Sequence, residues 1–158
     1  MNNNGLIAIR DTTVARDDVI LVEPFDPARS SGIPDPQRFA GRVVLRDGSS
    51  MLTEKKPAEF AAENGFRYLG KPDHIATNPD ITFRVQAFNL VVARKKNPEF
   101  KPERDFSSRL IWGRGGPNES KLLQNDRATV EAVVLLGQQD RKDHPNPGKA
   151  PAPQAKPK

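Results

Sequence analysis

Apolar and polar residues alternate most clearly over residues 81–96, which gives the longest β-strand signal in the chain. From Ile81 to Ala87 every second residue is apolar, as expected for a strand with one buried face, and the apolar run continues through residues 90–92. The phase of the alternation changes near Phe88, where we expect a bulge or a bend. The pattern therefore predicts one long strand with an irregularity near its middle.

A second apolar segment, residues 106–112, follows a polar stretch at residues 97–105 that contains two prolines. Proline and charged residues are typical of a loop between strands. We expect the two apolar segments to form an antiparallel pair joined by this loop. Both segments end in basic residues, so the pair should carry cations along a common edge.

Shorter elements are expected on either side of this pair. Apolar and β-branched runs bounded by Gly, Pro or Asp predict strands, at residues 6–9, 19–22, 42–46, 66–69 and 129–136. A helix is expected over Pro57–Asn64, because proline suits the first helical turn and Gly65 suits the position after the last one. A second short helix is expected over residues 118–125, where Asn118 can act as the N-cap.

Proline divides the chain into three parts. Four prolines within residues 24–41 exclude a helix and a central strand, so we expect an extended arm there. From residue 141 the chain is rich in proline, lysine and alanine, which predicts a basic tail that is disordered when alone. The expected division is strands and a proline-rich arm (1–41), a β-barrel domain (42–140) and the tail (141–158).

Strands separated by loops of very different length suit a small barrel better than a regular sandwich. We therefore expect a mainly β protein, built as a small antiparallel barrel with one or two short helices. The 158 residues are 35% hydrophobic and include 15 prolines, which agrees with one modest domain and segments outside its core.

The positive charge is concentrated in two places. The formal net charge is +5, and residues 84–114 alone hold eight Lys/Arg against three Asp/Glu. Residues 141–158 are also positive, whereas the remaining segments are slightly negative. This distribution favours an anionic partner, and an ordinary basic surface on a soluble domain stays open as the alternative.

No combination of residues indicates an enzyme. The chain has no cysteine, and His74 and His144 do not have the spacing of a metal site. Asp17 and Asp18 would point to opposite faces of a strand. The sequence G-R-G-G-P at residues 113–117 lacks the lysine of a phosphate-binding loop. We therefore expect no catalysis, cofactor, metal or small-molecule substrate.

The expected location is the cytoplasm, or a virion. The N-terminus does not begin with basic residues followed by a long apolar run, as a secretory signal does. No apolar stretch approaches the roughly 18 residues of a membrane span, so no membrane partner is expected.

The strand pair carries the residue types that bind a flexible polyanion. Cations neutralise phosphates whatever the base sequence, and aromatic rings stack on bases whatever their identity. The candidate phosphate contacts are Arg84, Arg94, Lys95, Lys96, Arg109 and Arg114, and the candidate stacking rings are Tyr68, Phe88, Phe106 and Trp112. The alternatives are that the rings fill the core and that the cations form a solvated edge. In the tail, Lys142, Lys149, Lys156 and Lys158 can add non-specific attraction.

From about residue 70 to residue 141 the chain resembles the single-stranded DNA-binding proteins of bacteria and phages. In that family a strand F-x-L-A-V-x-R precedes a charged hairpin, and a strand with D-F, three apolar residues and W-G-R follows, before a short helix and a last strand. The first pattern is matched by Phe88, Leu90, Val92 and Arg94, and the second by Asp105, Phe106, Leu110, Ile111, Trp112, Gly113 and Arg114.

The resemblance implies an oligonucleotide-binding (OB-fold) barrel and sequence-independent binding of single-stranded DNA in replication or recombination. A homo-oligomer is expected, because the N-terminal strands and the proline-rich arm suit contact with a neighbouring subunit. The lysine-rich C-terminus fits a phage or plasmid protein better than a bacterial one, since bacterial members end in an acidic tip. A second hypothesis is a structural or assembly protein of a viral particle or other large complex, because abundant proline and extended arms suit a subunit that binds its neighbours.

Overall fold

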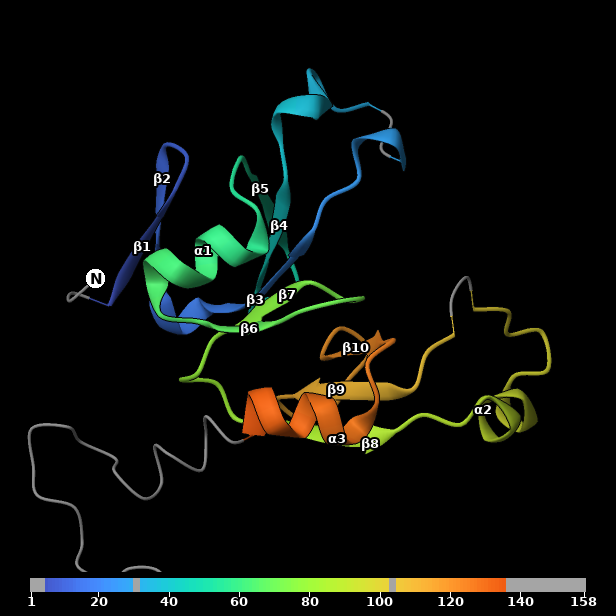
Figure 1. The fold of residues 1–158 in the computed structure, drawn as a ribbon. Helices are drawn as coiled ribbons and strands as arrows, with labels where there is room; N and C mark the ends of the chain where they lie inside the picture. The colour runs from blue at the N-terminus through green and yellow to red at the C-terminus, as the bar shows by residue number, and fades with distance from the viewer. Residues whose placement is uncertain (1–4, 30–31, 103–104, 136–158) are drawn as a thin grey trace, which may run out of the picture.

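Ten short strands, all paired antiparallel, make up most of the folded chain (Figure 1). The computed structural model describes residues 5–29, 32–102 and 105–135. Within these residues the strands form a hairpin, a five-stranded sheet of order β5-β4-β3-β7-β6 and a three-stranded sheet of order β10-β9-β8. The protein is therefore mainly β, as predicted, with three short helices. The predicted tail at 141–158 lies outside the described residues.

The large sheet and the hairpin come from the first half of the chain, and the small sheet from the second. The strands are β1 (Leu6–Ile9), β2 (Thr12–Ala15), β3 (Val19–Pro24), β4 (Gly41–Leu45), β5 (Ser50–Thr53), β6 (Arg67–Leu69), β7 (Ile75–Thr77), β8 (Phe83–Ala87), β9 (Ser108–Trp112) and β10 (Ser120–Leu123). The helices are α1 (Pro57–Asn64), α2 (Leu90–Lys96) and α3 (Arg127–Val130), and a π-helical segment (Glu131–Leu135) continues α3. Short 3₁₀ turns occupy Arg16–Asp18, Pro27–Arg29 and Pro36–Arg38.

Strand β3 is the centre of the large sheet, between β4 and β7, and residues 19–22 are completely buried. An irregularity in its pairing with β4, between Val19 and Leu21, shifts the alternation of its side chains. As a result Ile20 and Leu21 both face the core shared with the small sheet, while Val19 and Val22 face α1. The large sheet therefore combines β3, which precedes the proline-rich segment, with β4, β5, β6 and β7, which follow that segment.

The described residues between β3 and β4, 25–29 and 32–40, belong to a loop rather than to the predicted extended arm. Pro24 pairs with Gly41 across β3 and β4, so the two ends of the segment meet. Phe25 and Phe39 pack edge to face with ring centroids 6.2 Å apart, and both are buried. Apart from the 3₁₀ turns at Pro27–Arg29 and Pro36–Arg38, the described residues between β3 and β4 form no helix or strand, as the prolines predict. The two aromatic rings pack the ends of the segment together.

Helix α1 spans the predicted residues, Pro57–Asn64, because its two ends are specified locally. The Lys56 backbone N–H donates to the Glu59 carboxylate at 2.8 Å, and Gly65 ends the helix with a φ of 70°. Phe60 is buried against Phe66, with the ring centroids 5.4 Å apart.

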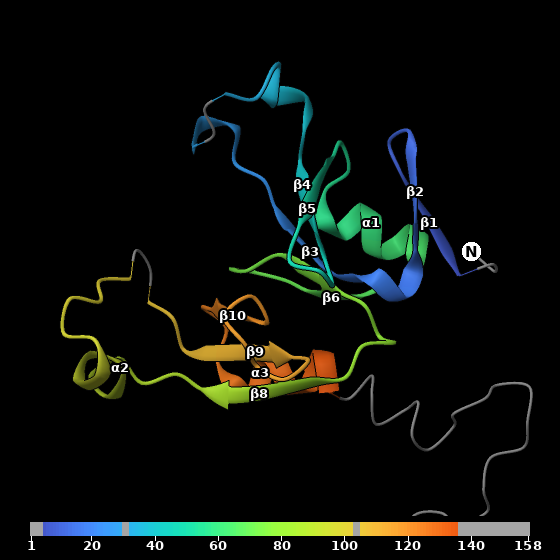
Figure 2. The ribbon, with the colours of Figure 1, turned by 180° about the vertical axis from the view of Figure 1, so that it is seen from behind.

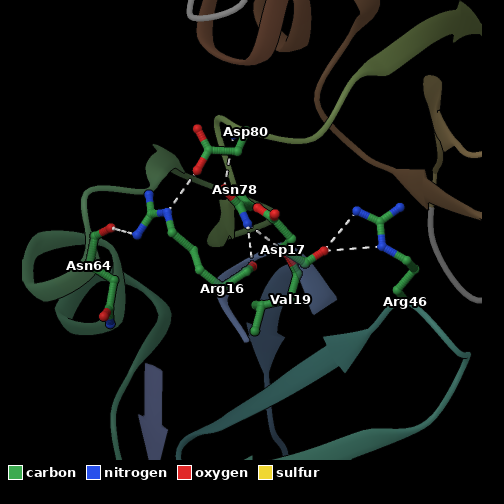
Figure 3. A network of polar contacts seen from close by, with 7 residues as sticks. All are labelled: Arg16, Asp17, Val19, Arg46, Asn64, Asn78 and Asp80. Carbon is green, nitrogen blue, oxygen red and sulfur yellow. Dashed lines mark hydrogen bonds and ion pairs between the residues drawn. The ribbon is translucent and has the colours of Figure 1, made fainter. Parts of the chain in front are cut away.

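Polar contacts join the first hairpin to the rest of the molecule (Figure 3). The Arg16 guanidinium donates to the Asp80 carboxylate at 2.8 Å and to the Asn64 carbonyl at 2.6 Å. Arg46 donates to the Asp17 carbonyl through Nε and Nη2, at 3.1 and 2.7 Å. The turn between β2 and β3 is thereby held to α1, to β4 and to the segment before β8.

The predicted long strand at residues 81–96 is wrong in its second half, which forms α2. The strand ends at Ala87, close to the change of phase at Phe88. The Asn89 side chain then accepts hydrogen bonds from the backbone N–H groups of Val91 and Val92, at 2.8 and 3.2 Å. This N-cap stabilises a helix over residues whose branched side chains favour strands.

Two further elements differ from the prediction in type. Residues 118–125 contain strand β10 instead of a helix, because the turn at 113–117 returns the chain onto β9. Residues 127–135 are helical instead of extended, and the Asp126 side chain caps this helix by accepting from Thr129 N–H at 2.9 Å. Val130 and Val134, four residues apart, are both buried, which is the spacing of one helix face.

The two sheets share one core. The large sheet contributes Ile20, Leu21, Leu69 and Ile75, the small sheet Phe83, Leu110, Trp112 and Leu123, and the last helical segment Val130 and Val134. The described strands close no barrel, since β5 and β6 stay the outer strands of the large sheet and β10 and β8 those of the small one. The predicted barrel is therefore not confirmed.

Candidate nucleic-acid interface

One face of the small sheet points away from the core and carries cations. Side chains alternate along β8 and β9, so Phe83, Leu110 and Trp112 face inward while Arg84 and Arg109 face outward. In Figure 2 these strands lie in front of α3, which covers the inner face, and no described element lies in front of them. The outer face also presents Gln86 and Ser120.

Arg84 and Arg109 are diagonal neighbours on this face. Arg84 lies opposite Ile111, and Arg109 lies opposite Gln86, which places the two backbones about 7–8 Å apart. Arg109 donates to the Ser120 hydroxyl at 3.1 Å, which fixes its direction. The Arg84 side chain extends toward the turn at residues 113–117 instead. One of its terminal nitrogens lies 3.1 Å from the position that a Cβ atom on Gly115 would occupy.

The turn at residues 113–117 holds Arg114 at this end of the sheet. The Glu119 carboxylate accepts from Gly116 N–H at 3.0 Å and from Arg114 N–H at 3.1 Å. The Gly116 bond, followed by the Arg114 bond, lowers the pKa of Glu119 from its usual 4.5. Gly113 has a φ of 59°, which favours glycine, and a Cβ there would lie 2.3 Å from the Glu119 carboxylate and displace it from this position.

A cleft of about 420 Å³ opens at the other end, between α2 and the loop that follows it. The half-buried rings of Phe88 and Phe106 pack edge to face in its wall, with centroids 6.4 Å apart. Two cations, Arg94 and Lys101, line the same cleft together with one carboxylate, that of Asp105, so the cleft keeps a net positive charge. The cleft therefore combines aromatic surface with positive charge, which are the two features that hold a base and its phosphate.

The cations of this region form no ion pairs among the described residues, although the charge of Arg114 helps to lower the pKa of Glu119. None of them forms an ion pair with an acidic residue in the described part of the chain: Arg84, Arg94, Lys95, Lys96, Lys101, Arg109 and Arg114. Arg94 donates to the Phe100 carbonyl at 3.2 Å, which orients the side chain without neutralising it. From Arg84 and Arg109 to Arg94 and Lys101, cations without ion-pair partners follow the strand direction, and Arg114 lies at the far end beside Glu119.

Trp112 is not a stacking platform on this face. Its side chain is only 5% exposed and packs edge to face on Phe83, with centroids 6.0 Å apart. Of the two interpretations of Trp112, the structure thus supports the core. Tyr68 lies on β6 of the large sheet, where its hydroxyl pairs with His74 Nδ1 at 2.8 Å, so it is not grouped with the cations.

Lys95 and Lys96 are exposed on α2 but do not line the cleft. The sequence predicts both as phosphate contacts together with Arg94, because all three lie at the basic end of the strand expected there. The sequence does not indicate Lys101 as a contact, because this residue lies in the expected loop at 97–105, where no alternation assigns a face to a side chain. The helix separates these residues, since Leu90 and Arg94 line the cleft four residues apart.

No family model, curated protein or solved structure matches this chain. None of the helices within 5–29, 32–102 and 105–135 is long and apolar enough to cross a membrane. Across those same residues, no group of three or more histidine and acidic side chains could hold a metal ion.

Proposed function

We propose that this protein binds single-stranded nucleic acid, without sequence preference and without catalysis, along the outer face of the β8–β9–β10 sheet. The observation that carries this proposal is the row of cations without ion-pair partners that leads from Arg84 and Arg109 to the cleft at Phe88 and Phe106. Such binding suits a protein that covers single strands during replication or recombination, with DNA favoured by the resemblance described above.

The proposal specifies how each part contributes. Arg84, Arg109 and Arg114 contact successive phosphates, while Arg94 and Lys101 contact the phosphate next to the base held in the cleft. A base on the exposed parts of Phe88 and Phe106 contributes roughly 1–3 kcal/mol. Because a paired base is not free to enter the cleft, single strands are preferred over duplex.

The test is fluorescence anisotropy of a labelled oligo-dT over a series of salt concentrations. For a single strand, log K falls with log salt by about 0.7 per neutralised phosphate, so Arg84→Ala with Arg109→Ala should lower the slope by about 1.4. Arg127→Ala is the matched control, because Arg127 is an exposed arginine on α3, whose helix covers the inner face, and it pairs with Glu131.

A second arm tests the cleft without a mutation. An oligomer with one abasic site should bind several-fold more weakly if a base occupies the cleft, because that base contributes stacking energy. Trp112 fluorescence should stay unchanged on binding, since the ring is buried. Absence of binding at low salt, or equal affinity of the double variant and the wild type, would refute the proposal.

The second candidate function is that of a structural or assembly protein. It is favoured by the apolar side chains exposed on α2, Leu90, Val91 and Val92, which suit a protein partner. Light scattering together with oligo-dT anisotropy separates the two functions: assembly by a protein that does not bind oligo-dT supports this one, and binding of oligo-dT supports the first.

A further inference from the structure

Helix α2 exposes an apolar surface at a projecting site. Val91 is 66% exposed and Val92 52%, and with Leu90 they account for three of the five exposed large apolar side chains of the described residues. β-Branched residues lower helix stability, and a seven-residue helix is marginal by itself. Exposure of two adjacent valines to water stabilises neither the helix nor the fold, so contact with a partner surface is the explanation that fits.

The outward surface of α2 is apolar and basic together. Leu90 and Arg94 line the cleft already described. Val91 and Lys95 are four residues apart, as are Val92 and Lys96, so each valine has a lysine on its own side of the helix. A matching partner must therefore offer a small apolar depression with carboxylates at its rim.

The same chain contains such a depression. A cleft of about 280 Å³ is lined by Val14, Leu45, Asp18, Arg46 and Asp47. Val14 and Leu45 are half-buried, and the two aspartates are exposed. Arg46 is already held by the Asp17 carbonyl (Figure 3), and the Asp47 carboxylate accepts from Ser49, while neither aspartate has an ion-pair partner among the described residues.

The two surfaces lie on opposite sides of the molecule. In Figures 1 and 2, α2 projects on one side and the β1–β2 hairpin, which carries Val14, lies on the other. One molecule therefore cannot bring its own α2 to its own cleft. Contact between two copies through these unlike surfaces is head to tail, which produces rings or open chains rather than a closed pair.

We propose that α2 of one copy docks in the Val14–Leu45 cleft of a second copy, with Val91 and Val92 inserted and Lys95 and Lys96 beside Asp18 and Asp47. The contact uses the outward side of α2 and leaves Arg94, Lys101 and the outer face of the small sheet free. It is therefore independent of the proposed nucleic-acid binding. A surface of this size gives weak, concentration-dependent association.

Charge reversal on each side tests the match. Lys95→Asp with Lys96→Asp should weaken association by about tenfold or more, and Asp18→Lys with Asp47→Lys should do the same. In a mixture of the two variants each acidic helix meets a basic cleft, and each basic helix an acidic one. Association should therefore return in the mixture, measured as molar mass by light scattering over a range of protein concentrations.

A second pair of substitutions keeps the test valid if the reversed charges disturb folding. Val91→Ala with Val92→Ala raises helix propensity, so it should leave thermal stability unchanged or higher while weakening association. A wild-type protein that stays monomeric at all concentrations overturns the inference. So does a mixture that fails to associate, or an alanine variant that associates as the wild type does. Oligo-dT binding by the variants, read separately, reports on the other proposal.

Discussion

At the residue scale, Asn78 is a buried polar side chain with all its hydrogen bonds made. Its amide donates to the Arg16 and Val19 carbonyls at 2.9 and 2.8 Å, and its carbonyl accepts from Asp80 N–H at 2.9 Å (Figure 3). The side chain is completely buried between the start of β3 and the segment that leads to β8. It thus connects the centre of the large sheet to the small sheet.

Replacing Asn78 with alanine should lower the free energy of unfolding by about 2–3 kcal/mol, because two buried carbonyls lose their donor. Urea denaturation followed by circular dichroism measures this. Gln37→Ala is the control, since Gln37 is exposed and should change stability by less than about 0.5 kcal/mol. An Asn78→Ala protein as stable as the control would show that this network is not structurally important.

At the scale of elements, the segment between β8 and β9 is an addition to a strand pair that is complete without it. Phe88 N–H donates to the Ser107 carbonyl at 3.0 Å, so the two strands are still hydrogen-bonded where the segment begins. Of the described residues in the segment, none belongs to either core cluster. The segment instead carries α2, the aromatic cleft and most of the unpaired cations.

Replacing residues 89–106 with Asn-Gly should therefore leave a folded protein, because a two-residue turn suits an antiparallel pair. Oligo-dT affinity should fall, through loss of Arg94, Lys101 and the Phe106 side of the cleft, and association of copies should disappear. Circular dichroism, anisotropy and light scattering measure the three effects. Unchanged oligo-dT affinity in a folded variant would contradict the role given to the cleft.

At the scale of the whole molecule, the two sheets form one cooperative unit. Leu110 of the small sheet is completely buried and belongs to the core cluster that contains Ile20 and Leu21 of the large sheet. Neither sheet has the residues to cover this surface alone, so we expect both to unfold in one transition.

Leu110→Ala should cost about 2–5 kcal/mol, and hydrogen exchange of the most protected amides in β3 and β9 should accelerate together. Leu6→Ala is the matched control, because Leu6 is 46% exposed. Loss of protection confined to β9 would show that the small sheet unfolds by itself.

The candidate surface could be predicted in part. The position of Arg84 follows from the alternation of residues 81–87, most of which the structure keeps as β8. Residues 106–112 do not alternate, so the position of Arg109 follows only from the pairing of β9 with β8. The position of Trp112 does not follow, since the pairing assigns a face to a side chain but not what covers that face. Phe83 and the last helix cover Trp112.

The sequence by itself determined the elements whose ends are specified by neighbouring residues. Helix α1 has its proline, its Glu59 contact and Gly65 within eleven residues of one another, and β3 and β4 are apolar runs with no competing helix signal. Helix α2 buries none of its residues, and the neighbouring Asn89 N-cap accounts for its type. Only the tertiary structure decided the type of β10 and α3. Valine and leucine runs are compatible with both helix and strand, and burial chooses between them. Val130 and Val134 reach the common core at helical spacing, whereas residues 120–123 complete a sheet that β9 has already begun.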